Sequence, residues 1–120
     1  MASRNTLTSA LPYTCYVSGT VTGDSSTPTL SQLSGVSPSD TGCVSISRTG
    51  AGDYNISVTN FRGPQGNLKG FGTGTTISNM ISCTSQSFTA DTETAVFTFK
   101  VETDASTAAD NGFNFLLLGD

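Results

Sequence analysis

Histidine and tryptophan are absent from this chain of 120 residues, and charged side chains are scarce. Charged residues fill 12% of the positions, whereas soluble domains usually carry roughly 25%. Without an imidazole the chain can build neither a Ser-His-Asp or Cys-His relay nor a histidine metal site. No Gly-x-Ser-x-Gly turn is present, and neither is the Gly-x-x-x-x-Gly-Lys-Ser/Thr loop that cradles phosphates. We therefore expect a protein that is not an enzyme, with no catalytic residues, no cofactor and no metal.

Basic side chains are few and scattered, so the chain offers no patch for the phosphates of a nucleic acid. The five are Arg4, Arg48, Arg62, Lys69 and Lys100. No apolar run approaches the ~20 residues that span a bilayer. The opening Met1–Thr6 lacks the long apolar region of a signal peptide. These features argue against nucleic acid and against a membrane as partners. The chain is expected to be made in a cytoplasm, or to be a processed or recombinant fragment.

Cysteine occurs three times, at Cys15, Cys43 and Cys83, an odd number at long spacing. No Cys-x-x-Cys pair is present, which argues against a zinc site and against thioredoxin-type redox chemistry. We expect three small, half-buried residues in strands, because a free cysteine packs like a small hydrophobic residue. One disulfide plus a spare thiol is the alternative.

Hydroxyl-bearing residues and alternating apolar residues are what the chain has instead. Serine and threonine fill 37 of the 120 positions, and glycine adds 13. Apolar residues recur with a period of two, most clearly over Thr94–Thr103, and turn-forming residues separate the runs. Further strands are expected over 13–22, near Leu30, and over 42–48, 54–58, 67–71, 75–84 and 113–118. The fold prediction is all-β: an antiparallel β-sandwich or jelly roll of seven to nine short strands.

Two hairpins are predicted from turn signals. Thr49–Asp53 is a glycine-rich turn suited to positive φ, and it joins the strands on either side of it. The polar loop Asp104–Gly112 leads from the strand at 94–103 into the last strand, as a second hairpin. Asp104, Asp110 and Asn111 offer loop oxygens for Ca²⁺, but their spacing matches no EF-hand. We expect a hairpin loop with Asx turns there.

The last strand is apolar on both faces, with Phe113, Phe115 and Leu117 on one and Leu116 and Leu118 on the other. A strand of this kind should be buried on both sides. In a two-layer domain of this size, the second face must lie under a loop of the same chain or against another subunit. We favour the subunit.

Two stretches resemble a known family. Val44–Thr59, which reads VSISRTGAGDYNISVT, resembles an Arg-Thr-Gly-x-Gly-x-Tyr hairpin in small β-domains of tailed-bacteriophage virion proteins. Phe97–Val101, followed by Ala109–Gly119, resembles their closing hairpin, in which a polar loop leads into an aromatic and aliphatic strand. The resemblance implies a virion component without catalytic residues, which decorates or cements the capsid or forms a fibre module, often as a trimer.

The expectation is therefore a capsid decoration or cement protein on the surface of the virion. Its partners would be the major capsid protein and copies of itself, as a homotrimer. Scarce charge fits a protein that is held in an assembly, because burying ions is costly. The alternative is a head or tail fibre module that binds a host-surface glycan or receptor, for which the tyrosines Tyr13, Tyr16 and Tyr54 are few and Tyr54 is expected in the core.

An N-terminal arm over residues 1–10 is expected to hold a capsid or neighbouring subunit, ahead of one sandwich domain over 11–120. The arm is polar and has no core of its own. The last strand supplies residues that are expected in the core or at a subunit contact. The predicted contact residues are Arg4, Asn5, Leu7, Phe113, Phe115, Leu116 and Leu118.

Overall fold

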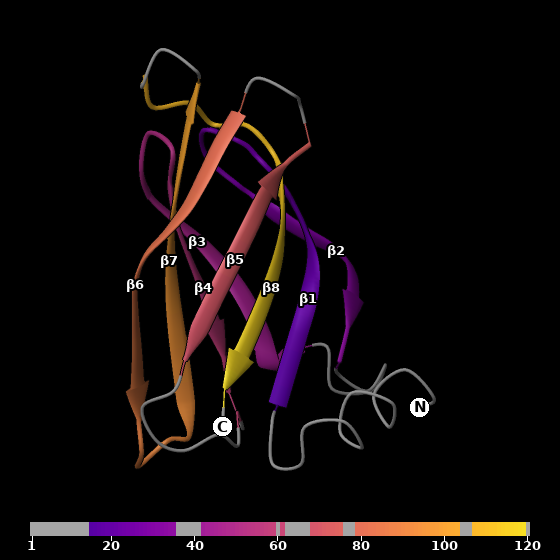
Figure 1. Cartoon of the computed structure of the whole chain (residues 1–120), viewed down its shortest axis with the longest axis vertical. Helices are drawn as coiled ribbons and strands as arrows, with labels where there is room; N and C mark the ends of the chain where they lie inside the picture. The colour runs from indigo at the N-terminus through magenta and orange to yellow at the C-terminus, as the bar shows by residue number, and fades with distance from the viewer. Residues whose placement is uncertain are drawn as a thin grey trace.

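A computed structural model describes residues 15–35, 42–59, 61, 68–75, 79–103 and 107–119 (Figure 1). These residues contain eight β-strands and no α-helix. The strands are β1 (Cys15–Thr22), β2 (Thr29–Ser34), β3 (Val44–Gly50), β4 (Asp53–Val58), β5 (Lys69–Gly74), β6 (Asn79–Thr89), β7 (Thr94–Thr103) and β8 (Phe113–Gly119). The predicted arm over residues 1–10 lies outside the described residues.

The strands form two four-stranded sheets that face each other (Figure 1). Sheet A has the order β2-β1-β8-β5, and sheet B has the order β3-β4-β7-β6. Every pairing in the two sheets is antiparallel. The all-β prediction is confirmed, and eight strands fall within the expected seven to nine.

The core lies between the sheets and follows the alternation in the sequence. In β7 the predicted inner residues Ala95, Phe97, Phe99 and Val101 are all fully buried. They pack against the inner face of β8, where the ring centroids of Phe99 and Phe113 lie 5.2 Å apart. Among the described residues, no charged side chain is buried. The members of the core are Val17, Val21, Val44, Tyr54, Ile56, Val58, Phe61, Leu68, Ala95, Phe97, Phe99, Val101, Phe113, Phe115 and Leu117.

The predicted C-terminal hairpin is wrong. β8 pairs with β1 and β5 in sheet A, while β7 pairs with β4 and β6 in sheet B. Both edges of β7 are thus occupied, so the chain after it must cross to the opposite sheet. There β8 takes a central position. The hairpin of β3 and β4 is confirmed, and it turns at Ala51 and Gly52.

β6 continues beyond the end of the strand predicted at 75–84. A bulge changes which of its residues face inward, so the sequence pattern does not reveal the second half of the strand. The register with β7 shifts between Cys83 and Ser85. Before the shift Ile81 and Cys83 pack against the core, and after it Phe88 does. An extra residue in one strand reverses the alternation. The period-two pattern therefore ends at Thr84, although the strand continues to Thr89.

The turn between β6 and β7 stores backbone strain at Glu93, whose φ is +50°. This left-handed conformation costs a residue other than glycine roughly 1–2 kcal/mol. We expect Glu93→Gly to raise the free energy of unfolding by about 0.5–1 kcal/mol, measured in urea. The matched control is Thr92→Gly, because Thr92 is not among the positive-φ residues, and it should lower that free energy. Equal losses from both variants would contradict the assignment of strain to Glu93.

Candidate functional site

Asp110 is the centre of the most connected polar cluster among the described residues. Its carboxylate accepts two hydrogen bonds from Arg48, Nε to Oδ1 at 2.9 Å and Nη2 to Oδ2 at 3.0 Å. The backbone N–H of Gly52 donates to Oδ1 at 3.0 Å, and the hydroxyl of Tyr54 donates to the same oxygen at 2.8 Å. The cluster thus joins the β3–β4 hairpin to the loop before β8.

The backbone of Gly52 is shaped for this contact. Its φ of +71° is a left-handed conformation that only glycine adopts without cost. A Cβ there would lie 2.5 Å from the carbonyl oxygen of Val101, so a side chain also has no room. Glycine therefore lets the tip of the hairpin turn its N–H toward Asp110.

The cluster shifts the ionisation of its members in opposite directions. The Arg48 guanidinium, followed by the Gly52 N–H, holds the pKa of Asp110 well below its usual range. Burial, reinforced by Asp110, raises the pKa of Tyr54 to about 12. The Asp110 carboxylate and the Tyr54 phenol are thus the favoured forms over the physiological range.

We call Asp110, Arg48, Gly52 and Tyr54 the lock, because their hydrogen bonds join the β3–β4 hairpin to the loop before β8. The donors to Asp110 are a guanidinium, an amide and a phenol, which occupy the lone pairs that Ca²⁺ would need. Within the described ranges, no group of three or more His, Cys, Asp or Glu residues could hold a metal ion. Asp104, the first residue of the loop for which Asx turns were predicted, lies outside the described residues. An Asx turn does occur in the β1–β2 loop, where the N–H groups of Ser26 and Thr27 donate to Asp24 Oδ1.

The outer face of sheet A carries an exposed apolar area. Leu118 lies opposite Tyr16 on β1 and Lys69 on β5. In the next row, Leu116 lies between Ser18 and Phe71. We call Tyr16, Phe71, Leu116 and Leu118 the apolar patch. Lys69 is the one charged side chain that the described strands place on this face.

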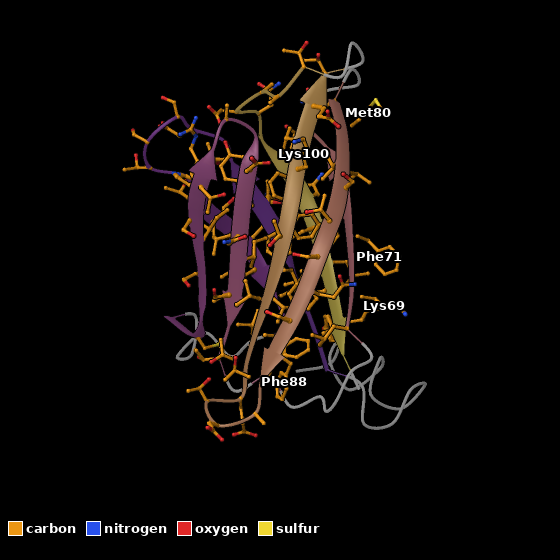
Figure 2. All side chains as sticks on the ribbon, turned by 90° about the vertical axis from the view of Figure 1, so that its left-hand side faces the viewer. Lys69, Phe71, Met80, Phe88 and Lys100 are labelled. Atoms are coloured by element: carbon orange, nitrogen blue, oxygen red, sulfur yellow. The ribbon has the colours of Figure 1, made fainter. Side chains whose placement is uncertain are left out.

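The apolar patch is open to solvent at its centre. The side chain of Phe71 is 53% exposed and that of Leu116 is 36% exposed. Figure 2 shows Phe71 and Lys69 projecting from sheet A on the side away from sheet B. Large apolar side chains that adjoin one another on a surface are typical of interaction sites.

The structure divides the predicted contact residues of the last strand into two groups. Phe113 and Phe115 lie inside the sandwich, with 0% and 4% exposure. They are core residues, so they are corrected as candidates for a subunit contact. Leu116 and Leu118 lie on the outer face of sheet A, next to solvent. The other predicted contact residues, Arg4, Asn5 and Leu7, lie outside the described residues.

Phe71 and Tyr16 are the members of the apolar patch that sequence analysis missed, and Phe71 is the more exposed of the two. Phe71 belongs to the run Lys-Gly-Phe-Gly-Thr-Gly, in which glycine takes every second position. The glycines face inward toward β6, as the contacts of a Cβ built on Gly70 and Gly72 indicate. The alternation then sends Phe71 outward. A strand with glycine inside and an aromatic residue outside is the signal that could have identified it.

The outer face of sheet B differs from that of sheet A, because hydroxyl and amide groups cover it. Ser45 lies opposite Ser57 across the β3–β4 pair. The hydroxyl of Thr98 donates to Asn55 Oδ1 at 2.8 Å. Neighbouring polar groups of this kind satisfy one another, and the one large exposed apolar side chain among the described residues of sheet B is Met80, near the end of the edge strand β6. The apolar patch is therefore a property of one sheet.

The cysteines follow the prediction in part. Cys15 and Cys83 belong to β1 and β6, whereas Cys43 comes just before β3. Cys43 and Cys83 are half-buried against the core. Burial raises the pKa of the Cys83 thiol, which favours its protonated form.

Comparison with known proteins gives no family: no protein-family model, no curated protein and no solved structure matches the chain. Separately, none of the described residues belongs to a helix of the length and apolar character that crossing a membrane requires.

Proposed function

We propose that this protein is a structural component of a virus particle, a capsid decoration or cement protein that bridges capsid subunits. The observation that carries the proposal is the exposed pair of Phe71, on the edge strand β5, and Leu116, on the neighbouring strand β8, on the outer face of sheet A. Burying such side chains against a partner contributes about 25 cal/mol per Å². The hairpin that resembles virion β-domains supplies the class of partner, which is the major capsid protein and further copies of the chain.

The low charge supports the same function. The chain carries nine acidic and five basic residues, for a net charge of −4. Polar surface made of hydroxyl groups can dock without desolvating ions, and short side chains lose little conformational entropy when they are held. A protein of this composition is suited to permanent residence in an assembly on the capsid surface.

The alternative function, a fibre module that binds a glycan, has less support. Sugar sites need an exposed aromatic ring with hydrogen-bonding groups beside it. Tyr54 is fully buried and Tyr16 is half-buried, and the neighbour opposite the exposed ring of Phe71 is Leu116. The surroundings of Phe71 favour a protein partner. If a glycan array gave hits that vanish in the Phe71→Ser variant, the glycan-binding fibre module would become the better-supported function.

Removal of residues 1–10 tests the proposed function. We expect the shortened protein to keep the β-sandwich and to lose attachment to capsids assembled from the major capsid protein of the same virus. The measurement is co-sedimentation with those capsids, with circular dichroism and thermal melting as the check of folding. The control is the full chain carrying Met80→Ser, because Met80 is 55% exposed and lies outside the apolar patch. Full loading of the shortened protein would show that the arm plays no part in attachment.

A further inference from the structure

The apolar patch occupies one end of sheet A, and it is the end at which β1 begins. Cys15 pairs with Gly119, and the next pair joins Tyr16 to Leu118. Toward the other end the same face is polar, because Thr20 lies opposite Asn114 and its hydroxyl donates to Asn114 Oδ1 at 2.8 Å. The chain therefore enters the sheet directly beside the apolar patch.

The residues that precede Cys15 have the composition to cover an apolar surface. The fourteen residues printed before it carry one charged side chain, Arg4, and a set of apolar ones. The larger apolar residues among them are Met1, Leu7, Leu11, Pro12 and Tyr13. Fully extended, fourteen residues span at most about 46–50 Å. The longest dimension of the molecule is 40 Å, so the segment is long enough to cross a neighbouring copy.

The sequence just before β1 favours a neighbouring copy over the same chain. To cover its own patch, the segment would have to reverse direction within a few residues of Cys15. Residues 10–15 contain no Gly, Asn, Asp or Ser, and Pro12 is the one residue among them of a type that favours turns. Pro12 fixes its own φ and biases Leu11 toward an extended backbone. The extended backbone that Pro12 favours at Leu11 suits a segment that continues onto a neighbouring copy.

We propose that the apolar patch of one copy binds the N-terminal segment, residues 1–14, of a second copy. Leu7 and Leu11 bury Phe71 and Leu116, and each copy both gives a segment and receives one. Such head-to-tail contacts close into a ring when the rotation between copies permits. This inference deepens the proposed function and rests on it, since it states how the copies are joined on the particle.

The test measures the oligomeric state of full chains by size-exclusion chromatography with light scattering. The wild type is expected as an oligomer. Phe71→Ser with Leu116→Ser removes the receiving surface, and Leu7→Ser with Leu11→Ser removes the segment. Both double variants should elute with the mass of one chain, 12.3 kDa. Met80→Ser, an exposed apolar residue away from the patch (Figure 2), should leave the oligomer intact.

An equimolar mixture of the two double variants gives the decisive result. One variant keeps an intact segment and the other keeps an intact patch, so together they should form a species with the mass of two chains. A mixture that stays monomeric, or a wild type that is monomeric, overturns the proposal and indicates a patch covered within one chain. An oligomer that survives Leu7→Ser with Leu11→Ser overturns it in favour of direct packing of sheet A on sheet A.

Two further measurements distinguish effects on folding and on capsid attachment from the effect on the oligomeric state. Far-ultraviolet circular dichroism and melting identify a variant that fails to fold, and Phe71→Ser alone then replaces the double variant. Loading onto capsids is measured independently. Normal loading of the wild type, together with an oligomer that survives both double variants, would leave the proposed function in place and contradict only the inference about the segment.

Discussion

Asp110→Ala is expected to lower the free energy of unfolding by about 2–4 kcal/mol, a large part of the roughly 5–15 kcal/mol that holds a domain folded. The substitution leaves the Arg48 guanidinium, the Gly52 N–H and the Tyr54 hydroxyl without their acceptor. The side chains of Arg48 and Asp110 are only 24% and 19% exposed, so water replaces the lost bonds poorly. Equilibrium unfolding in urea, followed by circular dichroism, measures the loss.

The matched control for this prediction is the second ion pair. Lys100 Nζ lies 3.9 Å from Asp53 Oδ1, and both side chains are about two-fifths exposed. Solvent-exposed pairs contribute about 0–1 kcal/mol. Asp53→Asn should therefore have a small effect. An equally small effect of Asp110→Ala would show that its cluster is not a lock.

The pH dependence of stability checks the same cluster independently. The pKa of Asp110 is lowered in the folded state, so its contribution is complete above the unfolded value of about 4. That contribution is lost as the pH falls further. The pKa of Tyr54 is raised to about 12, so its contribution is complete below about 10 and lost as the pH rises toward 12. Tyr54→Phe should remove the alkaline loss, and Asp110→Asn should reduce the acid loss.

The lock also connects the two distant stretches of sequence that resemble virion β-domains. Arg48, Gly52 and Tyr54 are the arginine, second glycine and tyrosine of the Arg-Thr-Gly-x-Gly-x-Tyr pattern. Asp110, which all three contact, belongs to the Ala-Asp-Asn-Gly run before the last strand. The patterns are therefore two halves of one structural unit, and local periodicity gives no hint of their contact.

The strands that could be predicted from the sequence are those with one buried face and one exposed face. β7 has the predicted bounds, Thr94–Thr103, because its buried positions are all apolar and Val96 is the one apolar residue at an outward position. β5 was predicted at 67–71 but spans Lys69–Gly74. Its inward positions hold Gly70 and Gly72, which carry no hydrophobic signal. The partner of β8 was also missed, since a choice between sheets depends on which strand edges are free.

The apolar patch shows a similar limit for the candidate site. The two-sided character of the last strand identified Leu116 and Leu118, because their alternation with Phe113 and Phe115 is visible in the sequence. Phe71 and Tyr16 join them only through pairing across 45 and 102 positions, as Phe71–Leu116 and Tyr16–Leu118. Register between distant strands follows from the folded sheet. A surface made by three strands was therefore out of reach of a local pattern.

β5 and β6 meet at a seam that depends on the absence of side chains. A Cβ on Gly72 would lie 2.4 Å from Ile81 Cγ2, and one on Gly70 would lie 2.6 Å from Cys83 Sγ. A real Cβ essentially never lies within 3.0 Å of a non-bonded atom of another side chain. The two glycines therefore allow β6, on the edge of sheet B, to approach β5, on the edge of sheet A. This approach closes one side of the sandwich.

Gly72→Ala is accordingly expected to lower the free energy of unfolding by about 2–3 kcal/mol, because an extra methyl group in a packed seam forces the strands apart. In an unconstrained strand the same change would be stabilising, since glycine costs about 0.5–1 kcal/mol relative to alanine. Gly42→Ala is the matched control, as a Cβ there meets nothing within 4 Å. In a double-mutant cycle, Ile81→Ala should recover part of the loss. Additive losses in that cycle would place the damage elsewhere than at the contact of Gly72 with Ile81.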